Sequence, residues 1–290
     1  MDNQPRTPIP THRIESVSIA FQLRYHFGFA TYRRQPNFTP PAIDLATEHL
    51  QILATKHQYH LIEFAFQADV LRCLVSLRPE QTPESFTRTI KGNLATSLRP
   101  LGIHKLWSRG TFARSNGTVD DKTITDYLAK QAQHHRAIPD RVPDYLAPCS
   151  FVSANDSSQL QRTAHAVYQN NLHFVFSVTR RQPILDPIAS EFLIAHWKRV
   201  CAMKGWTVWS ISVVPDHGHL MIGVPLNASP AEIALSLMNN SEHEFAKRYR
   251  GYFKEYAIDQ LWTSGFYVGT VGAATTDQIA GYLRNLPPSE

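Results

Sequence analysis

The stretch YHFGFATYRRQPNF at residues 25–38 recurs as LHFVFSVTRRQPIL at residues 172–185. Its Arg-Arg-Gln-Pro core is unchanged, and the flanking histidine and phenylalanines match at the same spacing, with His26 falling on His173. Further matches follow in order: Asp69 with Asp216, LWSRGTF (106–112) with LWTSGFY (261–267), and ITDYL (124–128) with IAGYL (279–283). A four-residue identity within an ordered series of weaker matches indicates an internal repeat. The sequence therefore predicts two tandem copies of one fold.

The predicted copies occupy residues 16–135 and 161–290, with a proline- and serine-containing linker at 136–160 and a disordered lead-in at 1–15. The distance between matched residues is 147 in the first half of each copy (26 to 173) and 155 near its end (127 to 282). The second copy therefore carries about eight extra residues in the region of its middle helix.

Composition indicates a soluble globular protein. The chain has 290 residues, of which 43% are hydrophobic and 18% charged. We find no run of about 18 apolar residues and no secretory apolar region at the start, so we expect a cytoplasmic location. Cys73, Cys149 and Cys201 are too dispersed for a disulfide framework or a zinc knuckle. The net charge of +5 is compatible with a nucleic-acid partner but does not establish one.

The second copy carries the clearer secondary-structure signals. Strands are predicted where apolar residues alternate, at 171–180, 206–214, 217–224 and 265–272. Helices are predicted where a capping residue and a proline precede helical apolar spacing, at 186–205 and 229–250, with a last helix at 275–286. The order β-α-β-β-α-β-α is that of a ferredoxin-like sheet with one added helix, so the predicted class is α+β.

His217 and His219 lie two residues apart in the predicted strand at 217–224. Residues at this spacing point to the same face of a strand, so the two imidazoles would stand side by side. Such a pair can bind a metal, or it can consist of polar residues on the solvated face of a half-buried sheet. A zinc enzyme is not expected, because no further histidine, cysteine or carboxylate follows at a ligand spacing.

Three motifs together resemble the HUH-type single-strand tyrosine transposases of the insertion sequence 200/605 group and their REP-associated relatives. They are PDHGHLMI (215–222), LWTSGFYVGTVG (261–272) and the tyrosine of IAGYLRN (279–285), in that order. One departure concerns the residue between the histidines, which is bulky and apolar in the family and is Gly218 here. The resemblance implies that His217 and His219 hold Mg²⁺ or Mn²⁺, that a glutamine four residues after the tyrosine completes the site, and that the tyrosine becomes covalently linked to DNA.

The two copies have kept complementary halves of this machinery. The second copy has the histidine pair, but Tyr282 is followed at i+4 by Leu286. In the first copy Val70 and Arg72 stand in place of the histidines, whereas Tyr127 has Gln131 at i+4, on the same helix face. In the family, the tyrosine helix of one subunit serves the histidines of its partner. A fused pseudo-dimer would then have one composite site: His217, His219, Gln131 and the nucleophile Tyr127, with Tyr282 as the alternative nucleophile if the helices act within one copy.

The resemblance implies an enzyme that cuts and rejoins single-stranded DNA, near a hairpin, as a monomeric pseudo-dimer or a homodimer. The alternative is a domesticated DNA-hairpin-binding protein without catalysis. Basic side chains that could contact phosphate, or could equally form a solvated face, are Arg33, Arg34, Arg180, Arg181, Lys247 and Arg248. Neither reading predicts a membrane partner.

Overall fold

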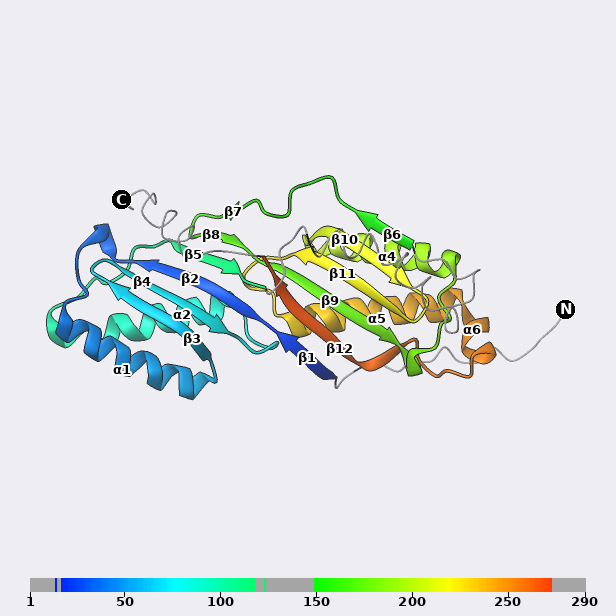
Figure 1. Cartoon of the computed structure of the whole chain (residues 1–290), viewed down its shortest axis with the longest axis horizontal. Coiled ribbons are helices and arrows are strands. Elements are labelled where there is room, and N and C mark those ends of the chain that lie inside the picture. Colours follow the sequence, from blue (N-terminus) through cyan, green and yellow to red (C-terminus); the bar gives the residue numbers. More distant parts are fainter. Residues whose placement is uncertain (1–13, 15–16, 118–122, 124–148, 273–290) are drawn as a thin grey trace.

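A computed structural model describes Ile14, residues 17–117, Thr123 and residues 149–272. This part of the chain forms two six-stranded sheets and five α-helices, and the two sheets lie end to end along the longest axis (Figure 1). The predicted α+β class is confirmed. Within the described ranges, none of the helices combines the length and apolar character that a bilayer crossing requires.

The first sheet has the strand order β3-β4-β2-β5-β8-β7. Its strands are β2 (Arg24–Ala30), β3 (His60–Gln67), β4 (Val70–Ser76), β5 (Thr111–Ser115), β7 (Gln161–Arg162) and β8 (Ala166–Gln169). It is accompanied by α1 (Pro40–His57), α2 (Pro83–Ser97) and the short 3-10 turns η1 (Tyr32–Arg34) and η2 (Arg99–Leu101). The four strands β2 to β5 pair antiparallel, and β5 pairs with β8 in parallel.

The second sheet has the strand order β1-β12-β9-β11-β10-β6. Its strands are β1 (Ser18–Gln22), β6 (Cys149–Val152), β9 (Asn171–Val178), β10 (Thr207–Val214), β11 (His217–Gly223) and β12 (Trp262–Val271). Its helices are α4 (Pro187–Lys204), α5 (Pro230–Arg248) and α6 (Arg250–Glu255), with the 3-10 turn η3 (Thr179–Arg181). Strand β6 lies within the predicted linker 136–160, and α6 lies where the second copy was predicted to be longer.

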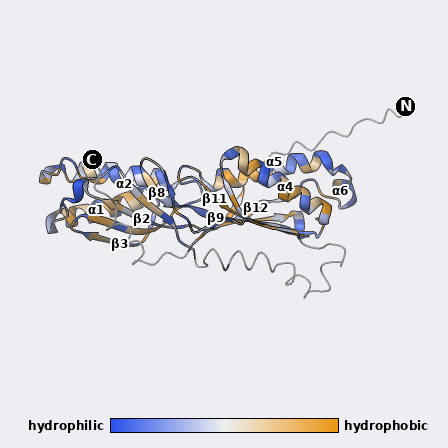
Figure 2. Cartoon of the chain, turned by 90° about the horizontal axis from the view of Figure 1, so that it is seen from above, coloured by the Kyte–Doolittle hydropathy of each residue, from blue (hydrophilic) through white to orange (hydrophobic). Residues whose placement is uncertain are grey.

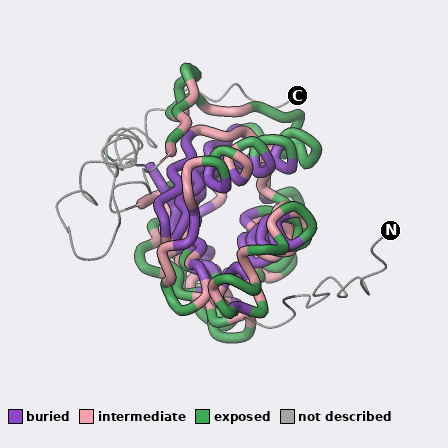
Figure 3. Tube along the Cα trace, turned by 90° about the vertical axis from the view of Figure 1, so that its right-hand side faces the viewer, coloured by how far each residue is buried: buried purple, intermediate pink, exposed green. Residues whose placement is uncertain are grey.

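The helices of the second copy begin where the sequence predicts. The side chain of Asp186 accepts a hydrogen bond from the backbone of Ala189 at 2.8 Å, which caps α4. The hydroxyl of Ser229 accepts from the backbone of Glu232 at 3.1 Å and caps α5 in the same way. Both helices lie on one side of β9, β11 and β12 (Figure 2), and buried residues gather along the strands and the facing sides of the helices (Figure 3). Side chains of these strands that alternate with the helix-facing ones therefore point to the opposite face of the second sheet.

Each copy contributes an equivalent strand from near its start to the sheet of the other copy. Strand β1 of the first copy pairs in parallel with β12 of the second sheet. Strand β8 of the second copy, which follows the two-residue strand β7, pairs in parallel with β5 of the first sheet. The two sheets are consequently completed by an exchange of equivalent strands.

Reciprocal hydrogen bonds accompany this exchange. The Ser115 hydroxyl donates to the carbonyl of Val271 at 2.7 Å, and the Thr270 hydroxyl donates to the carbonyl of Asn116 at 2.8 Å. Ser115 and Thr270 are equivalent in the two copies, as are Asn116 and Val271 (both 155 apart). One bond is thus the counterpart of the other, which indicates an approximate two-fold relationship between the copies.

A second reciprocal pair lies at the start of the middle helices. The backbone N–H of Glu84 donates to the carbonyl of Leu226 at 3.0 Å, and that of Ala231 donates to the carbonyl of Pro79 at 2.9 Å. Glu84 and Ala231 are equivalent, and so are Pro79 and Leu226 (both 147 apart). The two-fold relationship therefore extends beyond the exchanged strands.

Candidate active site

His217 and His219 lie on β11 and share one face of the second sheet, as their spacing predicts. Their ring centroids are 4.8 Å apart, with an angle of 68° between the ring planes. Both are buried, with 6% of each residue exposed. The residue between them, Gly218, faces the helices, where an added Cβ would lie 2.6 Å from Cη2 of Trp197. The indole thus fills the space that a bulky residue between the histidines would take.

A carboxylate orients His217. Asp216 lies in the turn between β10 and β11, and its Oδ1 is 2.6 Å from Nδ1 of His217. Its Oδ2 forms an ion pair with Arg181 at 2.9 Å. The side chain of Arg181 also donates to the hydroxyl of Ser177 at 3.1 Å. This chain of contacts fixes the ring of His217 and makes Nε2 the nitrogen through which it would bind a metal.

A third histidine orients His219. Nε2 of His173, on β9, lies 3.1 Å from Nδ1 of His219, and the two rings stack with centroids 5.3 Å apart. Burial lowers the pKa of His173 to about 4, so its ring is neutral near pH 7. A neutral imidazole has one acceptor nitrogen. If Nδ1 of His219 donates to it, the lone pair of His219 lies on Nε2, as metal binding requires.

The sequence alone does not assign His173 or Asp216 to the site. Each has a signal in the repeat, since His173 matches His26 and Asp216 matches Asp69. These matches indicate the repeat but not the site, because the distance of both residues from the histidine pair depends on strand pairing. In the register of the sheet, His173 lies opposite Met221, two residues beyond His219.

The first copy has the same framework without the histidines. Val70 and Arg72 lie on β4 at positions equivalent to His217 and His219 (both 147 apart). The supporting ion pair is retained, since Arg34 contacts Asp69 at 3.2 Å. In this copy the carboxylate therefore precedes a valine, which cannot bind a metal.

The arginines of the repeated motif have structural partners in both copies. Arg34 and Arg181 form the two ion pairs with aspartates. Arg33 lies over the ring of Tyr32 at 5.2 Å, and Arg180 donates to the carbonyl of Ala257 at 3.4 Å. The left-handed backbone is shared by both arginines of each motif: Arg33, Arg34, Arg180 and Arg181 have φ values of 50°, 58°, 58° and 55°. Through its ion pairs the motif positions the turns that carry Asp69 and Asp216. Contact of these arginines with DNA phosphates stays a prediction.

Some of the remaining predicted site residues are described by the structure and others are not. Lys247 and Arg248 end α5 and are exposed, and the Arg248 guanidinium lies over the ring of Phe192 at 5.3 Å. Tyr127, Gln131 and Tyr282 lie outside the described residues, so their positions relative to the histidines stay predictions. Among the residues that the structure describes, no group of three or more His, Cys, Asp and Glu side chains is arranged to hold a metal.

Comparison with known proteins identifies the family. A family model described as IS200-like transposase matches residues 19–131 and again residues 166–286. The chain belongs to the IS200-like transposase family. Because one model matches two successive segments, the predicted tandem duplication is also supported.

Individual relatives of this transposase correspond to one copy. The ISDra2 transposase TnpA of Deinococcus radiodurans is 24% identical over 119 residues, which are 41% of this chain and 85% of that protein. A crystal structure of a transposase from the same organism is 20% identical and covers 43% of this chain and 96% of its own, with a TM-score of 0.37. A REP-associated tyrosine transposase bound to a REP hairpin is 12% identical and covers 39% of this chain and 61% of its own, with a TM-score of 0.27.

Proposed function

We propose that this IS200-like transposase is a metal-dependent single-stranded DNA endonuclease and strand transferase with one composite active site per chain. The observation that carries the proposal is that each histidine of the pair has a partner on its Nδ1 atom. Nδ1 of His217 contacts Asp216, and Nδ1 of His219 contacts His173. Metal-binding histidines typically have such a partner on the other ring nitrogen, because it fixes the tautomer and the ring orientation.

The residues fit a divalent ion such as Mg²⁺ or Mn²⁺. His217 and His219 would each supply Nε2, and Gln131 would supply an amide oxygen. When bound, the ion would polarise the scissile phosphate and stabilise the negative charge that develops there.

The nucleophile is assigned to Tyr127, with Tyr282 as the alternative. Its phenolic oxygen forms a bond to phosphorus, and the bond from phosphorus to the 3′-oxygen breaks. The phenol loses its proton and the 3′-oxygen gains one, leaving a 5′-phosphotyrosine and a free 3′-hydroxyl. The covalent link conserves the phosphodiester bond energy for rejoining.

The cross-copy site requires that the two copies form an intramolecular pseudo-dimer of ferredoxin-like units. The exchange of β1 and β8 and the reciprocal bonds of Ser115 and Thr270 support this arrangement. Loss of the histidines from only one copy supports it further, because a composite site needs the pair once. A DNA hairpin with single-stranded flanks is the proposed substrate.

A covalent-adduct assay tests the proposal. The full chain is incubated with Mn²⁺ and single-stranded DNA that carries the hairpins flanking its own gene, and the modified peptide is identified by mass spectrometry. An adduct on Tyr127, abolished by Tyr127→Phe and by His217→Ala, is expected. An adduct on Tyr282 would refute the cross-copy assignment.

The runner-up function is a hairpin-binding protein without catalysis. The observation in its favour is that the first copy has Val70 and Arg72 in place of the histidines, so that copy has no histidine pair to bind a metal. Tight hairpin binding with no adduct on either tyrosine would establish that function and refute the proposed enzyme.

A further inference from the structure

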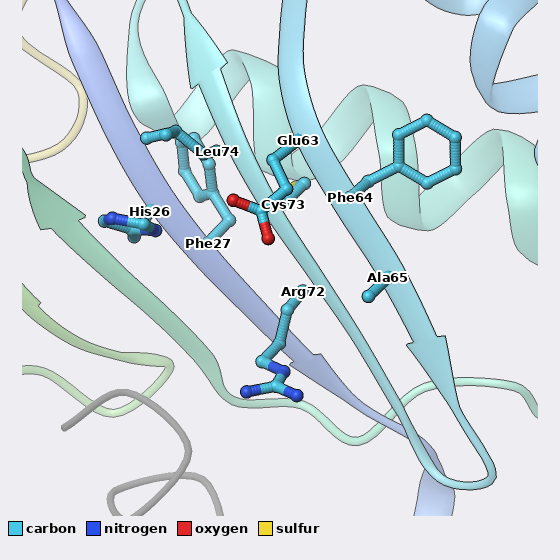
Figure 4. Close-up of a pocket in the computed structure, with 8 residues that line it drawn as sticks. All are labelled: His26, Phe27, Glu63, Phe64, Ala65, Arg72, Cys73 and Leu74. Carbon is cyan, nitrogen blue, oxygen red and sulfur yellow. The ribbon is translucent and has the colours of Figure 1, made fainter. Parts of the chain in front are cut away.

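The first copy carries a polar cluster at the place where the second copy has its histidines. Arg72, His26 and Glu63 come from the neighbouring strands β4, β2 and β3 and line a cavity of about 60 Å³ (Figure 4). Arg72 is the counterpart of His219, and His26 is the counterpart of His173 (both 147 apart). The cluster therefore lies on the sheet face that is equivalent to the candidate active site.

Arg72 presents an unsatisfied donor to this face. Its Nε is buried, and among the described residues it has no hydrogen-bond partner. Gly28 pairs with Arg72 on the adjacent strand β2 and contributes no hydrogen-bond acceptor from a side chain. A buried guanidinium nitrogen without an acceptor costs free energy, and an anionic ligand would remove that cost.

A second arginine adds positive charge beside the cavity. Arg114 on β5 pairs with His26 in the sheet register, and its Nε donates to Oε1 of Gln169 at 2.6 Å, which fixes its side chain. Burial lowers the pKa of His26, so its ring is neutral near pH 7. Glu63 is the opposing charge, and within the described part of the chain it forms no ion pair. Two guanidinium groups against one carboxylate leave the cluster with a net positive charge.

We propose that Arg72 binds a phosphodiester of single-stranded DNA without a metal, and that Arg114, two strands away in the same sheet, adds positive charge. Guanidinium groups suit phosphate oxygens, because they offer planar, permanently charged pairs of N–H donors. The histidine-free copy would then hold a DNA strand at the position where the second copy cleaves one. This inference rests on the proposed function for its choice of ligand, and it does not depend on the tyrosine chemistry.

Metal-free DNA binding tests the inference. The probe is a fluorescein-labelled oligonucleotide. It carries a hairpin, with its single-stranded flanks, from the DNA that borders the gene of this protein. Anisotropy is measured in EDTA over a range of salt concentrations for the wild-type chain and for Arg72→Gln. The substitution should raise Kd about tenfold and lower the magnitude of the salt slope by about one, as expected for one lost phosphate contact.

Matched variants make the result specific. Arg99→Gln removes the same charge from an exposed position of η2 and should leave the salt slope close to that of the wild type. Glu63→Gln should tighten binding, because it removes the opposing charge, and Arg72→Lys should preserve the slope. Thermal melting of each variant checks folding. If the glutamine variant of Arg72 does not fold, Glu63→Gln keeps the test valid, because unchanged affinity in that variant would refute the site.

The outcomes separate this inference from the proposed function. If Arg72→Gln matches Arg99→Gln in affinity and slope, the phosphate site is refuted. If deoxynucleoside monophosphate competes with the oligonucleotide at equal phosphate concentration, the ligand is a free nucleotide and the DNA assignment is refuted. If the wild type shows no Mn²⁺-dependent cleavage while the effect of Arg72→Gln persists, the proposed enzyme fails and the phosphate site stands.

Discussion

The backbone N–H of Gly117 donates to the carbonyl of Gly272 at 2.7 Å, and these two glycines occupy equivalent positions in the two copies (117 to 272, 155 apart). A contact between equivalent residues lies close to the approximate two-fold axis. Gly272 has a φ of 128° and comes so near to Ser115 that an added Cβ would lie 2.9 Å from its carbonyl oxygen. Only glycine satisfies both the conformation and the close approach at this point.

The reciprocal bonds near this axis should contribute measurably to stability. Ser115 is fully buried, donates to the carbonyl of Val271 and accepts from the backbone N–H of Asn171. Ser115→Ala leaves both buried groups without this partner, so we expect unfolding free energy to fall by about 1–3 kcal/mol in urea titrations. Thr96→Ala, on an exposed helix position, is the control and should change it by about 0.5 kcal/mol or less. Equal effects of the two variants would contradict the prediction.

The glycine between the histidines should be coupled to the tryptophan beneath it. Gly218→Leu would force a side chain into the indole of Trp197, and we expect a loss of about 3 kcal/mol in unfolding free energy. Trp197→Leu alone leaves a cavity and should also destabilise the fold. The equivalent residues of the first copy are Leu71 and Leu50, so the double variant Gly218→Leu/Trp197→Leu reproduces a pair already found in this chain.

We therefore expect the double variant to be more stable than the sum of the two single changes by at least about 1 kcal/mol, measured in a double-mutant cycle. Additive effects would mean that the Trp197 indole does not occupy the space that a side chain at residue 218 would need.

The carboxylate beside His217 should matter for metal binding if the histidine pair is a metal site. Asp216→Asn removes the charge that orients His217, and Mn²⁺ affinity by calorimetry should fall about 10- to 100-fold. Asp69→Asn is the matched control, because it breaks the equivalent ion pair with Arg34 in the copy that has no histidine pair. A similar loss of affinity in both variants would show that the effect does not act through the orientation of His217.

Lys91 should make stability depend on pH in the alkaline range. Burial lowers its pKa from 10.5 to about 8, while its Nζ donates to the carbonyls of Ser108, Arg109 and Gly110. The folded state therefore binds fewer protons than the unfolded state between these values, and stability from this group rises with pH between about 8 and 10.5. Below pH 8 the buried charge is a net cost.

The expected outcome is that wild type gains stability relative to Lys91→Met as pH increases from about 7.5 to 10, measured by urea unfolding at each pH. Lys56→Met, at an exposed helix position, should show no such trend relative to the wild type. A constant difference between wild type and Lys91→Met over this range would show that the ammonium group stays charged.

Local patterns determined much of the fold in advance. Asp186 and Ser229 cap helices that begin where the sequence predicts, because capping and proline preferences act over three or four residues. The shared face of His217 and His219 follows from the two-residue period of a strand. These predictions depend on neighbours in sequence, and the structure confirms them.

The exchanged strands and the supporting residues could not be predicted in this way. Nothing within Ser18–Gln22 specifies that it pairs with β12 of the other copy, since strand partners are chosen by packing between distant segments. The approach of His173 to His219 depends on the register between β9 and β11. The space next to Gly218 on the helix side of the sheet is filled by Trp197, which comes from a helix about 20 residues earlier. Each of these features is a tertiary contact without a local signature.

The exchange of β1 and β8 has a consequence for how this protein can change over time. In an assembly of two identical chains, one altered codon changes both active sites together. Here the two halves are encoded separately but are joined within one polypeptide, so each half can acquire substitutions independently while its counterpart is always present in equal amount. Val70 and Arg72 stand in one half where His217 and His219 stand in the other, a difference that a homodimer of one such domain could not have.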